Sequence, residues 1–124
     1  MARHRQIRII IVDDQATVRR GLVMRLAVEP DLDVIGVAAD GVDAVRLAAS
    51  LRPDVVLMDV VMPGLDGIDA TTAIRRVSPG SAVVLVSLYD DPDTIARVRE
   101  AGARAFLAKH DADRVVTAVR AVAR

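Results

Sequence analysis

The sequence VVLMDVVMPGLDG, residues 55–67, contains the transitions that decide the fold. Its first four residues are all apolar, which is typical of a short strand buried on both faces of a parallel sheet. Asp59 follows directly, and Pro63 and Gly64 then mark a sharp turn before a segment of helical period begins at Gly67. A buried strand, a turn and a helix in this order indicate one strand-and-helix unit of an α/β protein.

The same alternation of short apolar runs and longer helical segments continues outward in both directions. Asp91 followed by Pro92 is typical of a helix start, and Gly102 of a helix end. The sequence therefore predicts an α/β fold with a doubly wound, five-stranded parallel sheet. The expected strands are residues 7–12, 33–37, 55–58, 82–86 and 105–107, and the expected helices are residues 16–28, 42–51, 67–77, 92–101 and 112–123.

Length and composition favour a single domain over residues 1–124, with residues 1–6 frayed. The formal net charge is zero, so neither nucleic acid nor a membrane surface is expected as a direct partner. The chain has no cysteine, which excludes disulfides and thiol chemistry. The apolar run at 9–12 is too short for a signal peptide, and no segment is long enough to span a membrane.

Polar residues with chemical potential stand where the expected strands end. In an open parallel sheet these ends converge at one edge, where ligands bind. Clustered carboxylates repel one another, so either some of their pKa values are raised or a cation must neutralise them. An all-oxygen ligand set favours Mg²⁺ as that cation. The backbone carbonyl of Val61, in the loop after the third strand, could complete the metal ligands. The polar residues that follow or end the expected strands are Asp13, Asp14, Asp59, Ser87 and Lys109.

A lysine and a hydroxyl beside a magnesium site are the groups that stabilise charge on a transferring phosphoryl group. Asp59 would be the nucleophile, since a carboxylate is already ionised at neutral pH and needs no separate general base. No catalytic histidine is required.

Four motifs together resemble the receiver domains of two-component signalling: VDDQ at 12–15, LMDVVMPGLDG at 57–67, VLVSLYDD at 84–91 and GARAFLAKHD at 102–111. The resemblance covers essentially the whole chain. It implies a flavodoxin-like fold with strand order 2-1-3-4-5. In such a domain Asp14 would ligate Mg²⁺ with Asp13 assisting, and Asp59 would accept the phosphoryl group. Ser87 would hydrogen-bond that group, and Lys109 would pair with it.

The resemblance also implies a switch and partners. Ser87 would move toward the phosphoryl oxygens and Phe106 would turn inward, which changes the surface of the fourth helix, fifth strand and fifth helix. A sensor histidine kinase would be the phosphoryl donor, and the protein would be cytoplasmic. The stretch at 19–45 is most similar to receivers of the NarL/FixJ type, which carry a C-terminal helix-turn-helix DNA-binding output domain for transcription regulation. Residues 1–124 contain no such domain, so we favour a receiver excised from a longer regulator over a stand-alone one. A homodimer is compatible with either.

Three features depart from the family pattern. Leu88 stands where the family has a small residue, and its side chain could narrow access to Asp59. The usual Lys-Pro is Lys109-His110 here; a non-proline cis bond costs about 3 kcal/mol, so we expect a trans or strained loop and a shifted Lys109. Val61 and Tyr89 occupy positions that, in the family, flank the approach of the attacking water. Both side chains orient water poorly, which predicts a long-lived phosphorylated state.

The same residues bear on three other functions. An aspartyl-phosphate phosphatase resembles Asp-x-Asp at the nucleophile, whereas position 61 is Val, so no enzyme beyond self-phosphorylation and self-dephosphorylation is expected. A flavin binder would need a Ser/Thr/Gly-rich loop where Asp13 and Asp14 stand. The nearest rival is a degenerate receiver that binds partners without phosphorylation.

Plainer roles also remain open for individual residues. The acid pair could form a helix cap, Lys109 could be a surface charge, Ser87 could satisfy backbone groups, and Phe106 could be a core aromatic. The helical arginines are most simply solvated, although some could meet acids across a dimer interface. They are Arg19, Arg20, Arg25, Arg97, Arg99, Arg114 and Arg120.

Overall fold

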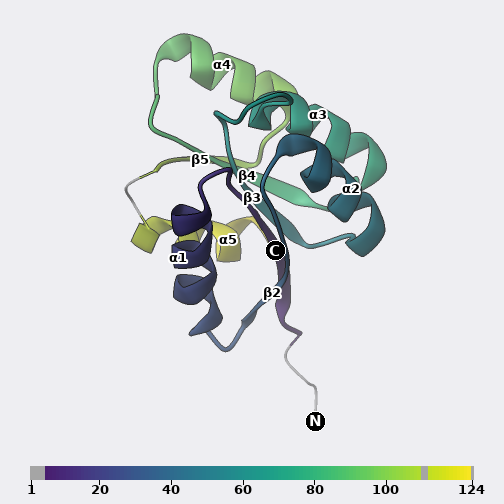
Figure 1. Cartoon of the computed structure of the whole chain (residues 1–124), viewed down its shortest axis with the longest axis vertical. Coiled ribbons are helices and arrows are strands. Elements are labelled where there is room, and N and C mark those ends of the chain that lie inside the picture. The colour runs from purple at the N-terminus through teal and green to yellow at the C-terminus, as the bar shows by residue number, and fades with distance from the viewer. Residues whose placement is uncertain (1–4, 110–111, 124) are drawn as a thin grey trace.

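The computed structural model describes residues 5–109 and 112–123, in which strands and helices alternate along the chain (Figure 1). The strands are β1 (Ile7–Val12), β2 (Leu32–Ala38), β3 (Val55–Asp59), β4 (Ala82–Ser87) and β5 (Ala105–Ala108). The helices are α1 (Ala16–Ala27), α2 (Gly41–Leu51), α3 (Gly67–Val77), α4 (Pro92–Ala101) and α5 (Ala112–Val122). The predicted α/β fold class is confirmed.

The sheet has the order β2-β1-β3-β4-β5, as the family resemblance implied, and all its pairings are parallel. Val12 pairs with Met58, and Asp59 pairs with Val86. The carboxyl ends of the central strands therefore lie at the same level. This register is what brings the residues at the ends of β1, β3, β4 and β5 to one edge of the sheet.

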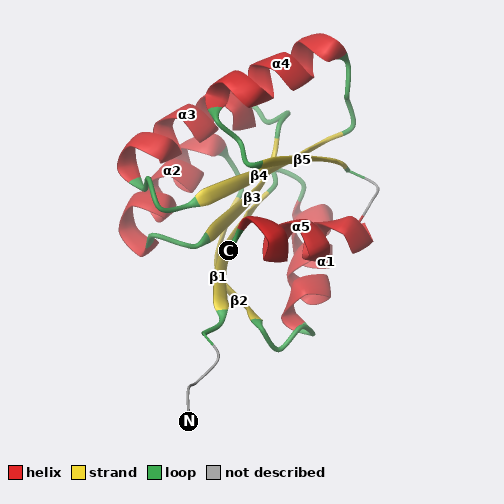
Figure 2. Ribbon diagram, turned by 180° about the vertical axis from the view of Figure 1, so that it is seen from behind, coloured by secondary structure: helices red, strands yellow, loops and turns green. Residues whose placement is uncertain are grey.

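Helices cover both faces of the sheet (Figure 2): α2, α3 and α4 lie on one face, and α1 and α5 on the other. Alternate strand residues divide between the two faces, because successive side chains of a strand point in opposite directions. Ile10 and Val56 pack on the side of α2, α3 and α4. Ile9 and Val55 pack on the side of α1 and α5. All four are fully buried, which explains why the central residues of β1 and β3 are apolar on both faces of the sheet.

The starts of three helices and the end of one follow from the local sequence. Asp40, Asp66 and Asp91 each accept a hydrogen bond from the backbone N–H three residues later, so they cap α2, α3 and α4. Gly102 ends α4 in the left-handed conformation with φ of 92°. In contrast, Gln15 precedes α1 without a side-chain capping bond.

Several observed ends differ from the predicted ones by one residue. The third strand includes Asp59, and the second helix begins at Gly41 because the Asp40 cap precedes it. Of the residues predicted to fray, residues 1–4 lie outside the described part of the chain. The Arg5 side chain donates a hydrogen bond to Asp54 at 3.0 Å, and the Gln6 side chain donates one to the Pro30 carbonyl at 3.1 Å.

In the described part of the chain, no helix combines the length and apolar character needed to cross a membrane.

Candidate functional site

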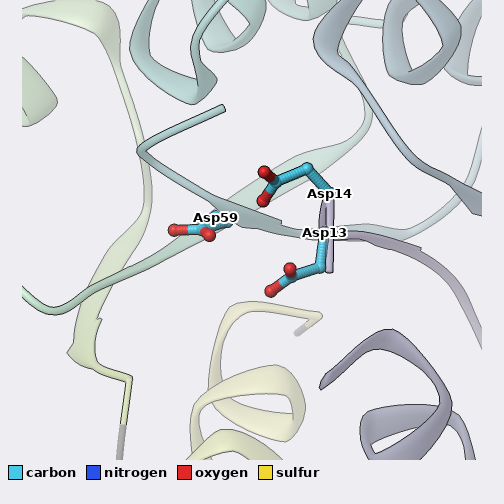
Figure 3. Close-up of side chains that lie close together, drawn as sticks. All are labelled: Asp13, Asp14 and Asp59. Atoms are coloured by element: carbon cyan, nitrogen blue, oxygen red, sulfur yellow. The ribbon is translucent and has the colours of Figure 1, made fainter. Parts of the chain in front are cut away.

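Three carboxylates meet at the carboxyl edge of the sheet. Each of Asp13, Asp14 and Asp59 offers an oxygen atom, and these atoms all lie within 4.8 Å of one another. Figure 3 shows the group, with Asp13 and Asp14 directly after β1 and Asp59 at the end of β3. Asp13 and Asp59 are buried, with 0% and 3% of their surfaces exposed, whereas Asp14 is exposed. The predicted acid cluster is therefore present, and it opens to solvent through Asp14.

Strand alternation explains why Asp13, Asp59 and Lys109 share a location. Asp13 continues the series of Ile9 and Ile11, which faces α1 and α5. In β3, Asp59 likewise continues the series of Val55 and Leu57, and in β5 Lys109 continues that of Ala105 and Leu107. All three side chains thus extend from strands on the same face of the sheet.

Lys109 joins the acid cluster directly. Its Nζ donates a hydrogen bond to Asp59 Oδ2 at 2.7 Å and lies 3.5 Å from Asp13 Oδ2. Burial opposes the charged ammonium, but the hydrogen bond to Asp59 and the two negative charges outweigh it and raise the pKa of Lys109. The lysine is therefore an ammonium ion at neutral pH, and one positive charge faces three carboxylates.

The Asp59 carboxylate is held from two sides. Oδ2 accepts from Lys109, and Oδ1 accepts from the backbone N–H of Val61 at 3.3 Å. Burial nevertheless raises the pKa of Asp59, assisted by the negative charge of Asp13, even though Lys109 and Val61 favour the charged form. The buried cluster thus has an electrostatic cost that an added cation would reduce.

Asp13 has a buried carboxylate oxygen that is suited to binding a cation. Its Oδ1 accepts from the backbone N–H of Gln15 at 2.8 Å. Its Oδ2 is fully buried and has no hydrogen-bond partner among the described residues. The Lys109 ammonium, at 3.5 Å, is an ion-pair neighbour of Oδ2. A buried carboxylate oxygen that accepts no hydrogen bond is costly, and a divalent cation would satisfy it. An all-oxygen cluster of this kind fits Mg²⁺.

A cavity of about 160 Å³ gives access to the acids. Its lining contains three apolar or aromatic side chains that are more than half exposed: Val61, Leu88 and Tyr89. Leu88 thus stands at the mouth of the site, where it was expected. The remaining lining residues are Asp14, Gln15, Asp59 and Lys109. The predicted effect of His110 falls on residues outside the described ranges.

Ser87 lies on the opposite face of the sheet from the acids, in the series of Val83 and Leu85. It is buried, and its Oγ accepts from the backbone N–H of Tyr89 at 3.0 Å. It lines a neighbouring cavity of about 320 Å³ instead of the one that contains Asp59. Phe106 is partly buried on this same face and lines a cavity of about 460 Å³ beside α4. The side chains of both residues proposed for the switch therefore extend from the face of the sheet opposite to that of Asp59 and Lys109.

Gly67 begins α3 directly against the end of β3. A Cβ atom at this position would overlap the carbonyl oxygen of Asp59 and would lie 3.0 Å from Val60 Cα. The backbone N–H of Gly67 donates to the Val60 carbonyl at 2.8 Å, and the Thr71 hydroxyl donates to the Gly67 carbonyl at 2.7 Å. Glycine is required here because two backbone segments approach closely. This contact fixes the loop that follows Asp59.

Among the arginines interpreted from the sequence as simply solvated, Arg19 and Arg120 make short, specific contacts. Arg19 Nη1 donates to the Asp13 carbonyl at 2.7 Å, and its side chain is partly buried. Arg120 binds both oxygens of Asp31 at 2.8 Å and Glu29 at 2.7 Å, which lowers the pKa of Asp31. A basic residue in the first turn of a helix is electrostatically unfavourable, so the position of Arg19 was a usable signal. The partners of Arg120 lie about ninety positions away, and only the fold brings them together.

Comparison with known proteins adds an independent result. The family model described as the response regulator receiver domain matches residues 9–120. Transcriptional regulatory protein LiaR of Bacillus subtilis (strain 168) is 47% identical over 120 residues, which are 95% of this chain and 56% of LiaR. A protein-glutamate methylesterase/protein-glutamine glutaminase of Anaeromyxobacter dehalogenans (strain 2CP-C) is 40% identical over 129 residues, covering 95% of this chain and 38% of that protein.

Among solved structures, the signal receiver domain of NarL from Mycobacterium tuberculosis superposes with a TM-score of 0.92 at 33% identity, covering 96% of this chain and 97% of that one. The chain spans about half the length of the curated relatives it matches. The strand order, the acid cluster with its lysine and the match over residues 9–120 agree. The chain belongs to the response regulator receiver domain family and is most similar to receivers of the NarL/FixJ type.

Proposed function

We propose that the protein is a phosphorylation-dependent signalling switch in which Asp59 accepts a phosphoryl group. The observation that carries the proposal is the pairing of Lys109 Nζ with Asp59 Oδ2 at 2.7 Å beside two further carboxylates. An ammonium ion at this position would stabilise the negative charge of a phosphoryl group attached to Asp59. The cavity beside Asp59 supports its assignment as the acceptor, because it leaves the carboxylate accessible.

The reaction would be a simple displacement at phosphorus. An ionised Asp59 oxygen forms the new bond to phosphorus while the bond between phosphorus and the donor's imidazole nitrogen breaks, and the imidazole leaves with the electron pair. The acceptor carries no proton, so no general base is needed. Lys109 would move its hydrogen bond from the carboxylate to a phosphoryl oxygen. Only self-phosphorylation and self-dephosphorylation would follow, without turnover of a free substrate.

The metal-binding residues would be Asp13, Asp14 and Asp59, with the backbone carbonyl of Val61. When bound, Mg²⁺ neutralises negative charge on the carboxylates and on the transferring group. The protein's own contribution is to hold Asp13 buried and oriented by the Gln15 N–H, with one oxygen left for the ion.

Signal output would depend on the opposite face of the sheet. Ser87 would exchange its bond with the Tyr89 N–H for one to a phosphoryl oxygen. Phe106 would then turn from the cavity beside α4 into the protein, so that the surface of α4, β5 and α5 changes. These movements are proposed from the family resemblance and from the cavities that adjoin both residues.

The donor would be a sensor histidine kinase, and the receiver would act in the cytoplasm. Its output would be a DNA-binding domain of a transcription regulator, a proposal supported by the name of the LiaR relative. The methylesterase relative shows that receivers of similar sequence also occur in proteins with a different activity. The nature of the output is therefore a separate question from the chemistry at Asp59.

The test is the intact mass of the protein after incubation with Mg²⁺ and acetyl phosphate. Parent protein should gain one phosphoryl group, and the gain should be lost with EDTA or in Asp59→Asn. Asp69→Asn removes an exposed carboxylate from the first turn of α3 and should behave like the parent. Absence of any gain in a folded parent would favour the degenerate receiver, and Leu88→Ala would then show whether the side chain at the mouth blocks access.

A further inference from the structure

We propose that Arg19 is a positioning residue that fixes the peptide group between Asp13 and Asp14 and thereby sets the affinity of the acid pair for a divalent cation. This inference rests on the proposed function, since it concerns the same metal site. Arg19 lies outside the acid cluster and contributes no ligand atom. It would act only through the backbone that carries two of the proposed ligands.

The contact is specific. Arg19 Nη1 donates to the Asp13 carbonyl oxygen at 2.7 Å, a short distance for a hydrogen bond from a charged donor. The side chain is partly buried, and within residues 5–109 and 112–123 it forms no ion pair with a carboxylate. Its backbone N–H donates to the Gln15 carbonyl at 2.9 Å, which anchors the arginine to the first turn of α1. The guanidinium therefore bridges helix α1 and the last residue before Asp14.

The backbone N–H and the side chain of Asp13 have separate hydrogen-bond partners. Its backbone N–H donates to the Ala38 carbonyl of β2 at 3.2 Å, and its Oδ1 accepts from the Gln15 N–H. The bond from Arg19 is the contact on the Asp13 carbonyl, and the direction of that carbonyl determines where the chain continues into Asp14. Asp14 is exposed and makes no hydrogen bond of its own within the described part of the chain. Its position therefore depends on the peptide group that Arg19 holds.

The location of Arg19 is unfavourable for the helix alone. It is the fourth residue of α1, whose first turn has no acidic residue and whose N-cap makes no side-chain bond. The positive end of the helix dipole disfavours a basic side chain there. Arg20, the next residue, is exposed and makes no such contact with Asp13. The two arginines differ in the contact to the acid pair, although they carry the same charge on the same turn.

A positioning role and a purely electrostatic role of Arg19 predict opposite changes in Mg²⁺ affinity when Arg19 is replaced. Removal of a nearby positive charge makes the site more negative, so a purely electrostatic role predicts tighter binding of Mg²⁺ by Arg19→Met. Loss of the hydrogen bond releases the Asp13 carbonyl, so a positioning role predicts weaker binding. The sign of the change therefore distinguishes the two.

The experiment is calorimetric titration of the metal-free full chain with Mg²⁺. We expect Arg19→Met and Arg19→Gln to raise the dissociation constant about tenfold, the lower end of the loss typical for outer-shell partners of metal ligands. Two neutral variants are used so that a failure of one to fold, checked by circular dichroism, leaves the other to decide. Arg20→Met is the matched control and should bind Mg²⁺ as tightly as the parent or slightly more tightly. Phosphorylation from acetyl phosphate should be restored in the Arg19 variants at saturating Mg²⁺.

The outcomes separate this inference from the proposed function. Unchanged or tighter Mg²⁺ binding by folded Arg19 variants would overturn the positioning role. If Asp13→Asn nevertheless fails to bind Mg²⁺, the assignment of Asp13 to the metal site would still stand. Failure of the parent itself to bind Mg²⁺ would overturn both. A weakening shared equally by Arg20→Met would also count against the inference, because it would show that charge on α1, and not the contact to Asp13, controls affinity.

Discussion

Replacement of Gly67 by alanine offers a sharp test of how the loop after Asp59 is held. The new methyl group would overlap the Asp59 carbonyl oxygen, and the other nearby atoms also belong to the backbone of Asp59 and Val60. No side chain can rotate away to make room. Helix α3 cannot retreat without stretching the 2.8 Å hydrogen bond from Gly67 N–H to the Val60 carbonyl. The strand end and the helix start must therefore separate.

The size of the effect follows from two opposing contributions. Overpacking of a well-packed site costs about 1–3 kcal/mol. Alanine in place of glycine in a helix contributes about 0.5–1 kcal/mol in the opposite direction. Because the overlapped atoms belong to the backbone, the upper half of the overpacking range applies, and we expect Gly67→Ala to lower the free energy of unfolding by about 1–2.5 kcal/mol. At about 4 °C per kcal/mol for a domain of this length, Tm should fall by about 4–10 °C.

Gly21 provides the matched control. It lies in α1, and a Cβ atom there would meet nothing within 4 Å. Gly21→Ala should therefore raise stability by about 0.5–1 kcal/mol through helix propensity alone. Thermal unfolding followed by circular dichroism measures both variants, and intact mass after acetyl phosphate treatment measures acceptance at Asp59. Equal stabilisation by the two substitutions would refute the close approach at Gly67. Unaltered phosphorylation in a destabilised Gly67→Ala would show that the contact supports the fold but not the acceptor.

Three further predictions concern the charges and the lifetime of the site. Burial raises the folded-state pKa of Asp59, so its ionised form reduces stability above that pKa. Asp59→Asn should therefore raise Tm at pH 7. The difference in Tm between variant and parent should vanish as the pH falls below 3.8, the ordinary pKa of an aspartate. Mg²⁺ at a hundredfold excess over its dissociation constant should add about 2.7 kcal/mol to the free energy of unfolding, and a stabilisation of that size persisting in Asp13→Asn would contradict the site. Val61 and Tyr89 are exposed at the mouth of the site and orient water poorly, so intact mass should show a phosphorylated state that persists well beyond seconds; its loss within seconds would refute this.

The parts of the site that could be predicted are those set by strand ends. Asp13 and Asp59 interrupt apolar runs, and parallel strands in register must bring such interruptions together. The alternation of side chains along β4 also determines that Ser87 shares a face with Val83 and Leu85. Which helices cover that face becomes clear only from the structure. The ion pairs of Arg120 and the overlap at Gly67 depend on tertiary contacts, so no local pattern indicates them.

The division of the site between the two faces of the sheet has a consequence for how such a protein can diverge. Asp13, Asp59 and Lys109 share a layer with α1 and α5, while Ser87 and Phe106 share the other layer with α4. Under the proposed function, substitutions of Phe106 and its neighbours in the second layer would alter which partner reads the phosphorylated state, while Asp13, Asp59 and Lys109 in the first layer would keep their contacts. Phosphoryl acceptance and partner recognition would then be open to separate change by substitution within one domain.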